Sequence, residues 1–246
     1  MLKRQRPIAV STSVYDDGSR RRVGDIMVER GSGESKSGVL YAQLRRDLMA
    51  GEFAPGARIS EAELSRVYEV SRSPIREAVV RLEAEGLLSR SGMVISVRAR
   101  SEGEIIDIYR VRVHLEAEIA ADAARRREDL DVVRLRAAVE AEAAIDRTDS
   151  TAVVDANRRF HAALADASHN RTLVELQSRL TAQIATLPAT TLLAPGRWER
   201  AHAEHGEIAA AVAAQDAETA ALIARAHMQE AKDLRVEYVT QQAMSG

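Results

Sequence analysis

The sequence contains no cysteine and few aromatic, glycine or proline residues. Without cysteine the chain can form neither a disulfide nor a thiolate metal site, and it has no cysteine nucleophile. Aromatic residues make up 3% of the 246 residues and hydrophobic residues 46%, so the core must consist of alanine, leucine, valine and isoleucine. With only 13 glycines and 5 prolines, this composition is typical of a mostly helical protein.

Long apolar segments are also missing from the sequence. No apolar run approaches the roughly 20 residues that a helix needs to span a bilayer. The basic stretch at 1–6 is not followed by the apolar region of a signal peptide. We therefore expect a cytoplasmic protein with no membrane partner.

The near-neutral formal charge of −2 hides an asymmetry along the chain. Residues 1–100 carry 18 Lys and Arg against 13 Asp and Glu, whereas residues 101–246 carry 17 against 24. These balances, +5 and −7, indicate two parts with different partners. A basic N-terminal part suits a polyanion such as nucleic acid, although charge alone is equally compatible with a role in solubility.

The N-terminal part divides into a tail and a small domain. Residues 1–37 are rich in Arg, Ser, Gly and Asp without apolar periodicity, which predicts a flexible basic tail. Residues 38–100 show the order helix, helix, helix and short β-ribbon, with Gly92 in the turn of the ribbon. This order predicts a winged helix-turn-helix domain.

The third predicted helix, residues 71–85, begins with polar side chains that suit DNA. An arginine near the start of such a helix can reach guanine O6 and N7 in the major groove. Serine hydroxyls and the helix N-terminal amides suit phosphate oxygens. The alternative is that these arginines only cover a surface helix. The candidates are Ser71, Arg72, Ser73 and Arg76.

Residues 101–241 show helical periodicity throughout. The apolar repeats predict six amphipathic helices, which would form an antiparallel bundle. The fold class expected for the whole chain is therefore mainly α. The predicted segments are 102–127, 129–146, 150–167, 170–187, 196–213 and 216–240.

Arg112 interrupts the apolar stripe of the first of these helices, between Ile108 and Leu115. A buried guanidinium needs an anion beside it. Glu116, one turn further on, would supply one within the chain, and the spacing favours this pairing. The alternative is a carboxylate or phosphate of a ligand.

Polar side chains also interrupt the apolar stripes of three later helices. Asn157 and His161 lie four residues apart on one face, while His205 and His227 lie on the apolar faces of the last two helices. If they converge, the four could bind a divalent metal ion. The alternative is that each histidine is a satisfied core residue.

Several of these residues also carry a resemblance to a known family. Residues 51–61 and 64–88, the latter containing Ser-Arg-Ser-Pro-Ile-Arg-Glu-Ala, closely resemble the GntR family of bacterial transcription regulators. The C-terminal part resembles the six-helix branch of the FCD effector domain of the FadR subfamily. That resemblance rests on Arg112-x-x-x-Glu116, Asn157-Arg-Arg-Phe-His161, Glu204-His205 and His227.

The GntR resemblance implies that Arg72 and Arg76 contact an operator, with Ser71 and Ser73 supporting them. It also implies a homodimer on an inverted repeat of double-stranded DNA, with Gly92 at the tip of the wing. The wing departs from the family pattern, because Arg90-Ser91-Gly92 forms a shorter turn than the usual Asn-Arg-Gly.

The FCD resemblance implies a divalent metal ion, Zn, Ni or Mn, held by Asn157, His161, His205 and His227. Arg112 would lie beside it and help to bind a small organic acid as effector. Asn157 departs from the family pattern, which often has aspartate there, and a neutral amide oxygen is the weaker ligand.

These features together predict a metabolite-responsive transcription regulator, a repressor released by its effector, and not an enzyme. One alternative is a metal-dependent hydrolase, because three histidines with an open position could activate water. No carboxylate lies clearly on the same face as a general base, since Asp155 points away from Asn157. A second alternative is a DNA-binding dimer whose bundle senses nothing.

Overall fold

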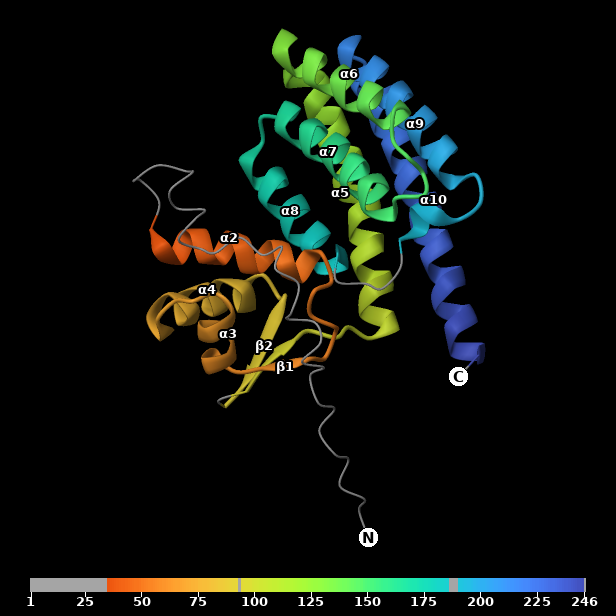
Figure 1. Ribbon diagram of the computed structural model, residues 1–246. Helices are drawn as coiled ribbons and strands as arrows, with labels where there is room; N and C mark the ends of the chain where they lie inside the picture. The colour runs from red at the N-terminus through yellow and green to blue at the C-terminus, as the bar shows by residue number, and fades with distance from the viewer. Residues whose placement is uncertain (1–34, 93, 186–189, 246) are drawn as a thin grey trace. The chain divides into compact units, whose positions relative to one another are not determined.

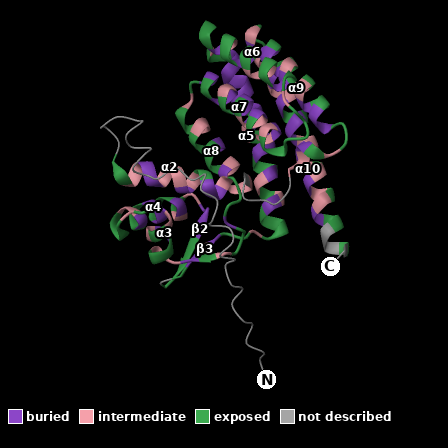
Figure 2. Ribbon diagram, viewed as in Figure 1, coloured by how far each residue is buried: buried purple, intermediate pink, exposed green. Residues whose placement is uncertain are grey.

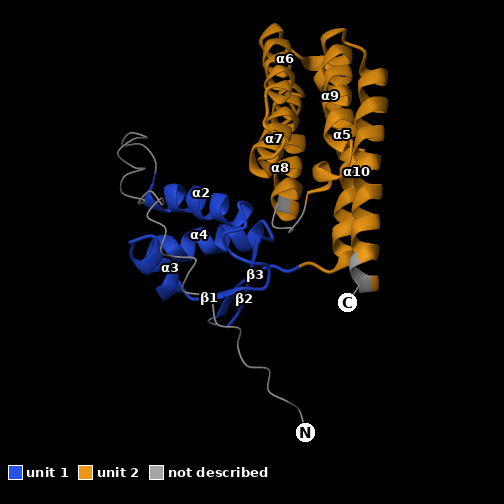
Figure 3. Cartoon of the chain, turned by 45° about the vertical axis from the view of Figure 1, so that its right-hand side comes forward, with its two compact units in different colours: residues 1–99, 185–188 blue, residues 100–184, 189–246 orange. Residues whose placement is uncertain are grey.

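The structure is a computed structural model that describes residues 35–92, 94–185 and 190–245. Nearly all of the predicted tail lies outside these residues. The chain divides into two compact units, one of residues 1–99 and 185–188 and the other of residues 100–184 and 189–246 (Figure 3).

The first unit contains helices α2, α3 and α4 and a three-stranded sheet (Figure 1). The sheet is antiparallel with strand order β1-β3-β2. This arrangement confirms the predicted winged helix-turn-helix, and adds the two-residue strand β1, which the sequence analysis missed. The elements are α2 Lys36–Met49, β1 Arg58–Ile59, α3 Glu61–Val67, α4 Arg72–Ala84, β2 Leu88–Ser91 and β3 Val94–Val97.

One boundary differs from the prediction at the start of this unit. The tail was expected to extend to residue 37, but α2 begins at Lys36. The reason is Ser35, which caps the helix because its Oγ accepts a hydrogen bond from the Gly38 amide at 3.1 Å. The apolar faces of the three helices and β3 then form a core of fully buried side chains, including Leu40, Leu44, Leu64, Ile75, Leu82 and Ile95.

The second unit is a bundle of six helices in the described residues, as predicted (Figures 1 and 3). Helices α5 and α10 pack side by side along most of their length. None of the described helices could cross a membrane. The bounds are α5 Glu102–Arg126, α6 Asp129–Ala143, α7 Ser150–Ala167, α8 Arg171–Ala185, the short 3-10 helix η2 Thr191–Leu193, α9 Arg197–Ala213 and α10 Ala217–Ser245.

Helix α10 ends later in the chain than the sequence pattern predicts. It continues to Ser245, beyond the predicted end of the domain at residue 241. The physical reason is the absence of a helix breaker before Gly246, because neither glycine nor proline occurs within α10.

The core of the bundle consists mainly of small side chains. Figure 2 shows buried residues on the facing sides of the helices. Many are alanines, among them Ala120, Ala124 and Ala209. The aromatic ring of Phe160 lies among them and stacks on the imidazole of His205, with 3.9 Å between ring centroids. The hydrophobic core of the bundle is therefore in direct contact with a buried polar side chain, that of His205.

Candidate metal centre and DNA interface

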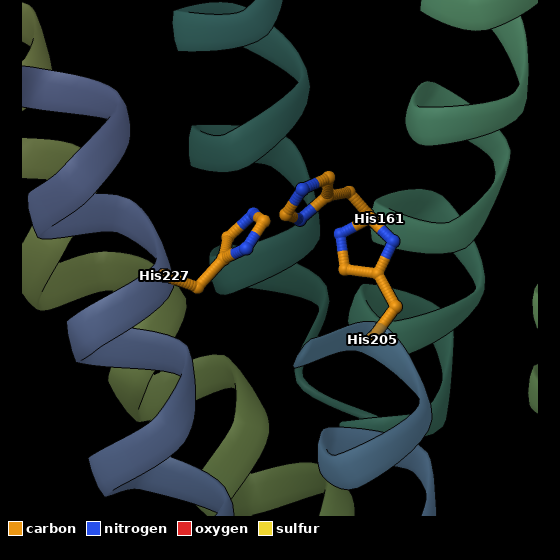
Figure 4. A group of neighbouring side chains, drawn as sticks. All are labelled: His161, His205 and His227. Atoms are coloured by element: carbon orange, nitrogen blue, oxygen red, sulfur yellow. The ribbon is translucent and has the colours of Figure 1, made fainter. Parts of the chain in front are cut away.

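Three helices of the bundle present histidines to one another (Figure 4). His161 comes from α7, His205 from α9 and His227 from α10, and all three are buried. One ligand atom of each lies within 4.8 Å of those of the other two. The ring centroids are 4.8 to 5.3 Å apart. The three histidines of the predicted metal site therefore do meet in the structure.

Each of these histidines has its own glutamate. The Nδ1 atom of His161 lies 3.1 Å from Glu116 Oε2, and that of His205 lies 2.8 Å from Glu142 Oε1. The Nδ1 atom of His227 lies 2.6 Å from Glu204 Oε2. At His161 and His205 the carboxylate at Nδ1 fixes the proton on that nitrogen, so that Nε2 keeps a lone pair for a metal ion. At His227 the Nη2 of Arg197, a donor, also lies 3.1 Å from Nδ1.

Burial favours the neutral imidazole at two histidines of the cluster, His205 and His227. Burial lowers the pKa of His205 well below its ordinary value, and the nearby His227 and His161 lower it further. Burial also lowers the pKa of His227, to about 4, although the hydrogen bond to Glu204 opposes the shift. Neutral imidazole is the form that binds metal ions.

Two polar side-chain atoms on these helices are orphaned. His205 Nε2 and Asn157 Oδ1 are both buried without a hydrogen-bond partner in the described part of the chain. Asn157 lies one turn before His161 on α7, so the two side chains share a face of the helix. Buried polar atoms are rarely left unpaired, and a ligand that accepts an electron pair from each would satisfy both.

The separation of the histidines also fits a shared ion. Nitrogen–zinc bonds are about 2.0–2.1 Å long and zinc sites are tetrahedral, so two nitrogens on one ion lie about 3.4 Å apart. The ligand atoms of the cluster lie within 4.8 Å of one another, so the rings would have to close by up to about 1.4 Å around an ion. The donor set present therefore fits a divalent ion, which would supply Lewis-acid charge at the cluster.

Arg112 is buried and forms the internal ion pair that its spacing favoured. Its Nη2 donates to Glu116 Oε1 at 3.1 Å. Burial raises the pKa of Glu116, but the charges and hydrogen bonds of His161 and Arg112 outweigh it and lower that pKa to about 2. The Nε of Arg112 has no hydrogen-bond partner in the described residues. Arg112 can thus hold Glu116 in place and still donate to a bound anion.

A second arginine shares the aromatic neighbour of Arg112. The guanidinium carbons of Arg112 and of Arg235, on α10, each lie 5.7 Å from the ring centroid of Tyr109. Both arginines and the tyrosine are buried. Positive charge from α5 and from α10 therefore meets at the Tyr109 ring.

Sequence reasoning missed two groups that complete the cluster. Glu142 has a detectable signal, because it lies seven residues after buried Leu135 on the inner face of α6. Arg197, the first residue of α9, has none in the sequence. It is 1% exposed, and its Nη1 donates to Glu204 Oε2 at 2.9 Å, which fixes the carboxylate that faces His227.

The predicted DNA-contacting residues lie at the exposed start of α4. Ser71 is the N-cap residue and makes no side-chain capping hydrogen bond, so its hydroxyl is free of that role. Arg72 and Ser73 are exposed beside it. The side chain of Arg76, one turn on, is 63% exposed. All four therefore lie on one accessible helix end.

Arg76 is held by a glutamate from the neighbouring helix. Its Nε donates to Glu61 Oε2 at 2.8 Å, and Arg90 of the wing donates to Glu61 Oε1 at 3.1 Å. Glu61 engages only the Nε of Arg76, so the ion pair does not use its two terminal nitrogens. These are the nitrogens that pair with guanine O6 and N7.

Gly92 occupies the tip of the wing, in the turn between β2 and β3. Its φ of +62° lies in the left-handed region, which side chains other than glycine rarely adopt. The residue is exposed, and a Cβ atom there would meet nothing within 4 Å. The glycine is therefore required by the backbone conformation and not by crowding.

Comparison with family models matches both units. Residues 36–94 match the family "Bacterial regulatory proteins, gntR family", and residues 107–230 match the FCD domain. Together the two matches span the helix-turn-helix, the wing up to Val94 and the helices that carry the histidine cluster.

Curated relatives and solved structures agree with these matches. The HTH-type transcriptional repressor GlaR of Escherichia coli (strain K12) is 28% identical over 216 residues, which is 84% of this chain and 96% of GlaR. The uncharacterized HTH-type transcriptional regulator YdhC of Bacillus subtilis (strain 168) is 34% identical over 142 residues, 55% of this chain and 62% of YdhC.

The fold is shared with the solved structure of E. coli McbR/YncC. The TM-score is 0.70 at 23% sequence identity, over 85% of this chain and 99% of that one. The family models and the relatives are of DNA-binding regulators, so the hydrolase alternative has no support. The chain therefore belongs to the GntR family, with an FCD domain after its helix-turn-helix, and is a transcription regulator and not an enzyme.

Proposed function

We propose that this regulator is a repressor that a small organic acid releases from DNA. The acid would bind in the helical bundle at a divalent ion, Zn, Ni or Mn, held by Asn157, His161, His205 and His227. The observation that carries this proposal is the set of three histidine–glutamate pairs, which at His161 and His205 leaves Nε2 to bind an ion.

Arg112 is proposed as the second anchor of the acid. Its unpartnered Nε is a buried donor beside the cluster, and Glu116 fixes the rest of the guanidinium. A charged donor to a carboxylate makes a stronger hydrogen bond than a neutral one. A bound ion would supply the other positive charge, so the two anchors would take an acid with its carboxylate between them.

On the DNA, we propose that Arg72 and Arg76 read bases while Ser71 and Ser73 contact phosphates. Gly92 would bring the tip of the wing close to the minor groove. A homodimer places two such helices on the two halves of an inverted repeat. The exposed end of α4 and the exposed side chain of Arg76, whose terminal nitrogens are not used by Glu61, support this assignment.

The proposal places the chain in the FadR subfamily and in the bacterial cytoplasm, where the operator DNA lies. The match of residues 107–230 to the FCD domain supports the subfamily, and the DNA-binding domain supports the location. Acid binding can release DNA only if the acid has different affinities for the DNA-competent and released arrangements of the dimer.

A thermal-shift screen tests the metal-dependent binding of an acid. Purified protein loaded with zinc is melted with a panel of small carboxylic and sugar acids, each with and without a chelator. An acid bound at 100 times its dissociation constant stabilises the folded state by about 2.7 kcal/mol. We expect at least one acid to raise the Tm, and we expect the chelator to abolish that shift.

Two variants make the screen specific for the cluster. His161→Ala removes one proposed ligand and should abolish the shift. His114→Ala is the matched control, because His114 is exposed on α5 and contacts Arg225 instead of the cluster. A shift that persists in His161→Ala, or the absence of a shift with every acid, would contradict the proposed site.

A further inference from the structure

One glutamate of the first unit holds two arginines from different elements. Glu61, the first residue of α3, accepts from Arg76 Nε at 2.8 Å through one carboxylate oxygen and from Arg90 Nη1 at 3.1 Å through the other. Arg76 lies on α4, which carries the proposed base-reading residues, and Arg90 lies on strand β2 of the wing. The two parts of the domain that are proposed to contact DNA are therefore joined by a single carboxylate.

A second glutamate extends this network beyond Arg90. Glu83 Oε2 lies 3.5 Å from Arg90 Nε. Glu83 follows Arg76 by seven residues on α4, so the two lie about two turns apart on the same face of that helix. The network thus contains two carboxylates and two guanidiniums, and their formal charges cancel.

The carboxylate of Glu61 is ionised and largely covered. The hydrogen bond from Arg76 lowers the pKa of Glu61 below its ordinary value, and the hydrogen bond from Arg90 lowers it further. The side chain of Glu61 is 17% exposed, whereas that of Arg76 is 63% exposed. The guanidinium of Arg76 therefore stays accessible although a negative charge holds it at Nε.

Neither folding nor DNA affinity accounts for a carboxylate in this place. Ion pairs near the surface typically contribute only about 0–1 kcal/mol to stability. A negative charge beside a DNA-contacting arginine repels phosphates, and attraction to phosphates supplies much of the affinity for any DNA. A group that weakens binding to every DNA still raises specificity if it weakens binding to the wrong DNA more.

We propose that Glu61 is a positioning residue that sets specificity, because it restrains Arg76 and Arg90 from binding DNA phosphates indiscriminately. The proposal rests on the base-reading role proposed above for Arg76. Since Glu61 engages only the Nε of Arg76, the terminal nitrogens remain for guanine O6 and N7, on a guanidinium that is already fixed. A phosphate elsewhere in the groove recruits this guanidinium only by breaking its pair with Glu61.

The same restraint acts on the wing. Arg90 lies between Glu61 and Glu83, so it binds a phosphate only by giving up both carboxylates. A released Arg90 would add a contact that carries no sequence information. Such a contact raises the affinity for every DNA and makes binding depend more steeply on salt.

The test is the effect of Glu61→Gln on specificity and on salt dependence. The glutamine keeps the shape, loses the charge and no longer offers a separate acceptor oxygen to each arginine. Fluorescence anisotropy measures the affinity of the full chain for an operator selected from random DNA and for unrelated DNA of the same length, at several salt concentrations. Affinity for unrelated DNA should rise and the specificity ratio should fall. Each released arginine that binds a phosphate should steepen the slope of log affinity against log salt by about 0.9.

The matched control is Glu63→Gln, which removes the same charge from the same turn of α3. In the described part of the chain Glu63 accepts hydrogen bonds from Ser60 and from no arginine, and glutamine also forms such a capping box. This variant should keep the wild-type specificity ratio and salt slope. In an Arg90→Gln background, Glu61→Gln should steepen the slope less, because one of the two arginines that it releases is gone.

Melting curves followed by circular dichroism establish that each variant is folded. Weaker binding of Glu61→Gln to both DNAs would show that Glu61 only supports the domain, and an effect equal to that of Glu63→Gln would show that only its charge matters. Either result overturns the proposal. If Arg76→Ala still relaxes the base preference in that case, the proposed base reading stands and only the role of Glu61 fails. If Arg76→Ala weakens binding to both DNAs equally, the base reading fails, and the proposal for Glu61 fails with it.

Discussion

At the scale of the residue, the capacity of each histidine to bind a metal ion depends on which of its ring nitrogens carries the proton. Glu116, Glu142 and Glu204 each lie at the Nδ1 atom of a histidine, and the Nε2 atom of His205 has no hydrogen-bond partner in the described residues. The glutamates act as positioning residues. Their effect should be visible in metal affinity even though none of them touches the proposed ion.

Glu142 gives the sharpest test of this role. Glu142→Gln keeps the shape but weakens the hydrogen bond that fixes the His205 tautomer, so zinc affinity should fall by about 10–100-fold. Competition for zinc with a chromophoric chelator measures the zinc affinity of each variant. Glu140→Gln, at an exposed position of the same helix, is the control. Unchanged zinc affinity in Glu142→Gln would show that the glutamate does not position the ligand.

Arg76 is the corresponding residue on the DNA side. Loss of its two terminal nitrogens in Arg76→Ala should cost about 1–3 kcal/mol of binding free energy at a specific operator and relax the base preference. Fluorescence anisotropy on an operator selected from random DNA, compared with unrelated DNA, measures both. An equal loss on both DNAs would mean that Arg76 contacts only phosphates.

At the scale of the element, helix caps fix where the functional side chains lie. Ser101 caps α5 in a capping box, since its Oγ accepts from the Glu104 amide while Glu104 accepts from the Ser101 amide. Helix α5 in turn carries both Arg112 and Glu116. The Ser101 cap thereby fixes where α5 begins, although it lies about three turns from Arg112 on that helix.

Ser101→Ala should therefore lower the free energy of unfolding of the bundle by about 1 kcal/mol. Ser71→Ala is a matched control, because Ser71 is also an N-cap residue but makes no side-chain capping hydrogen bond. Urea unfolding followed by circular dichroism compares the two variants. A loss in Ser71→Ala as large as that in Ser101→Ala would contradict the assignment to the cap.

The elements that the sequence predicted well are those with strong local signals. Helix α7 has the predicted bounds, 150–167, because Asp149 caps its start by accepting from the Thr151 and Ala152 amides. Strand β1 was missed because two residues, Arg58 and Ile59, carry no periodicity and are strand only through pairing with β3. The predicted end of α8 lies outside the described residues.

The candidate site shows the same division between local and tertiary signals. The three histidines could be predicted because each interrupts an apolar stripe on its own helix. Their glutamates could not all be assigned, because the contact between Glu142 and His205 joins residues 63 positions apart. The burial of Arg197 could not be predicted either. An arginine at the start of a helix is expected to be exposed, whereas this one is buried and donates to Glu204.

At the scale of the whole molecule, the proposed ion would tie three helices of one unit together. His161, His205 and His227 come from α7, α9 and α10, so a ligand shared by them binds only the folded bundle. Zinc at 100 times its dissociation constant should then stabilise the bundle by about 2.7 kcal/mol. Scanning calorimetry should show a lower Tm after chelation in the wild type. The same comparison in His161→Ala should show no such change, and a wild-type Tm that chelation leaves unaltered would contradict a metal-linked bundle.

The most direct test of the account is the release of DNA by an acid at the histidine cluster. Zinc-loaded protein is bound to a fluorescent operator fragment, and the acid that raised the Tm is titrated in. We expect the anisotropy to fall to the value of free DNA for the wild type, and we expect His161→Ala to stay bound at the same acid concentrations. DNA binding that is indifferent to the acid in the wild type, or equal release from His161→Ala, would contradict it.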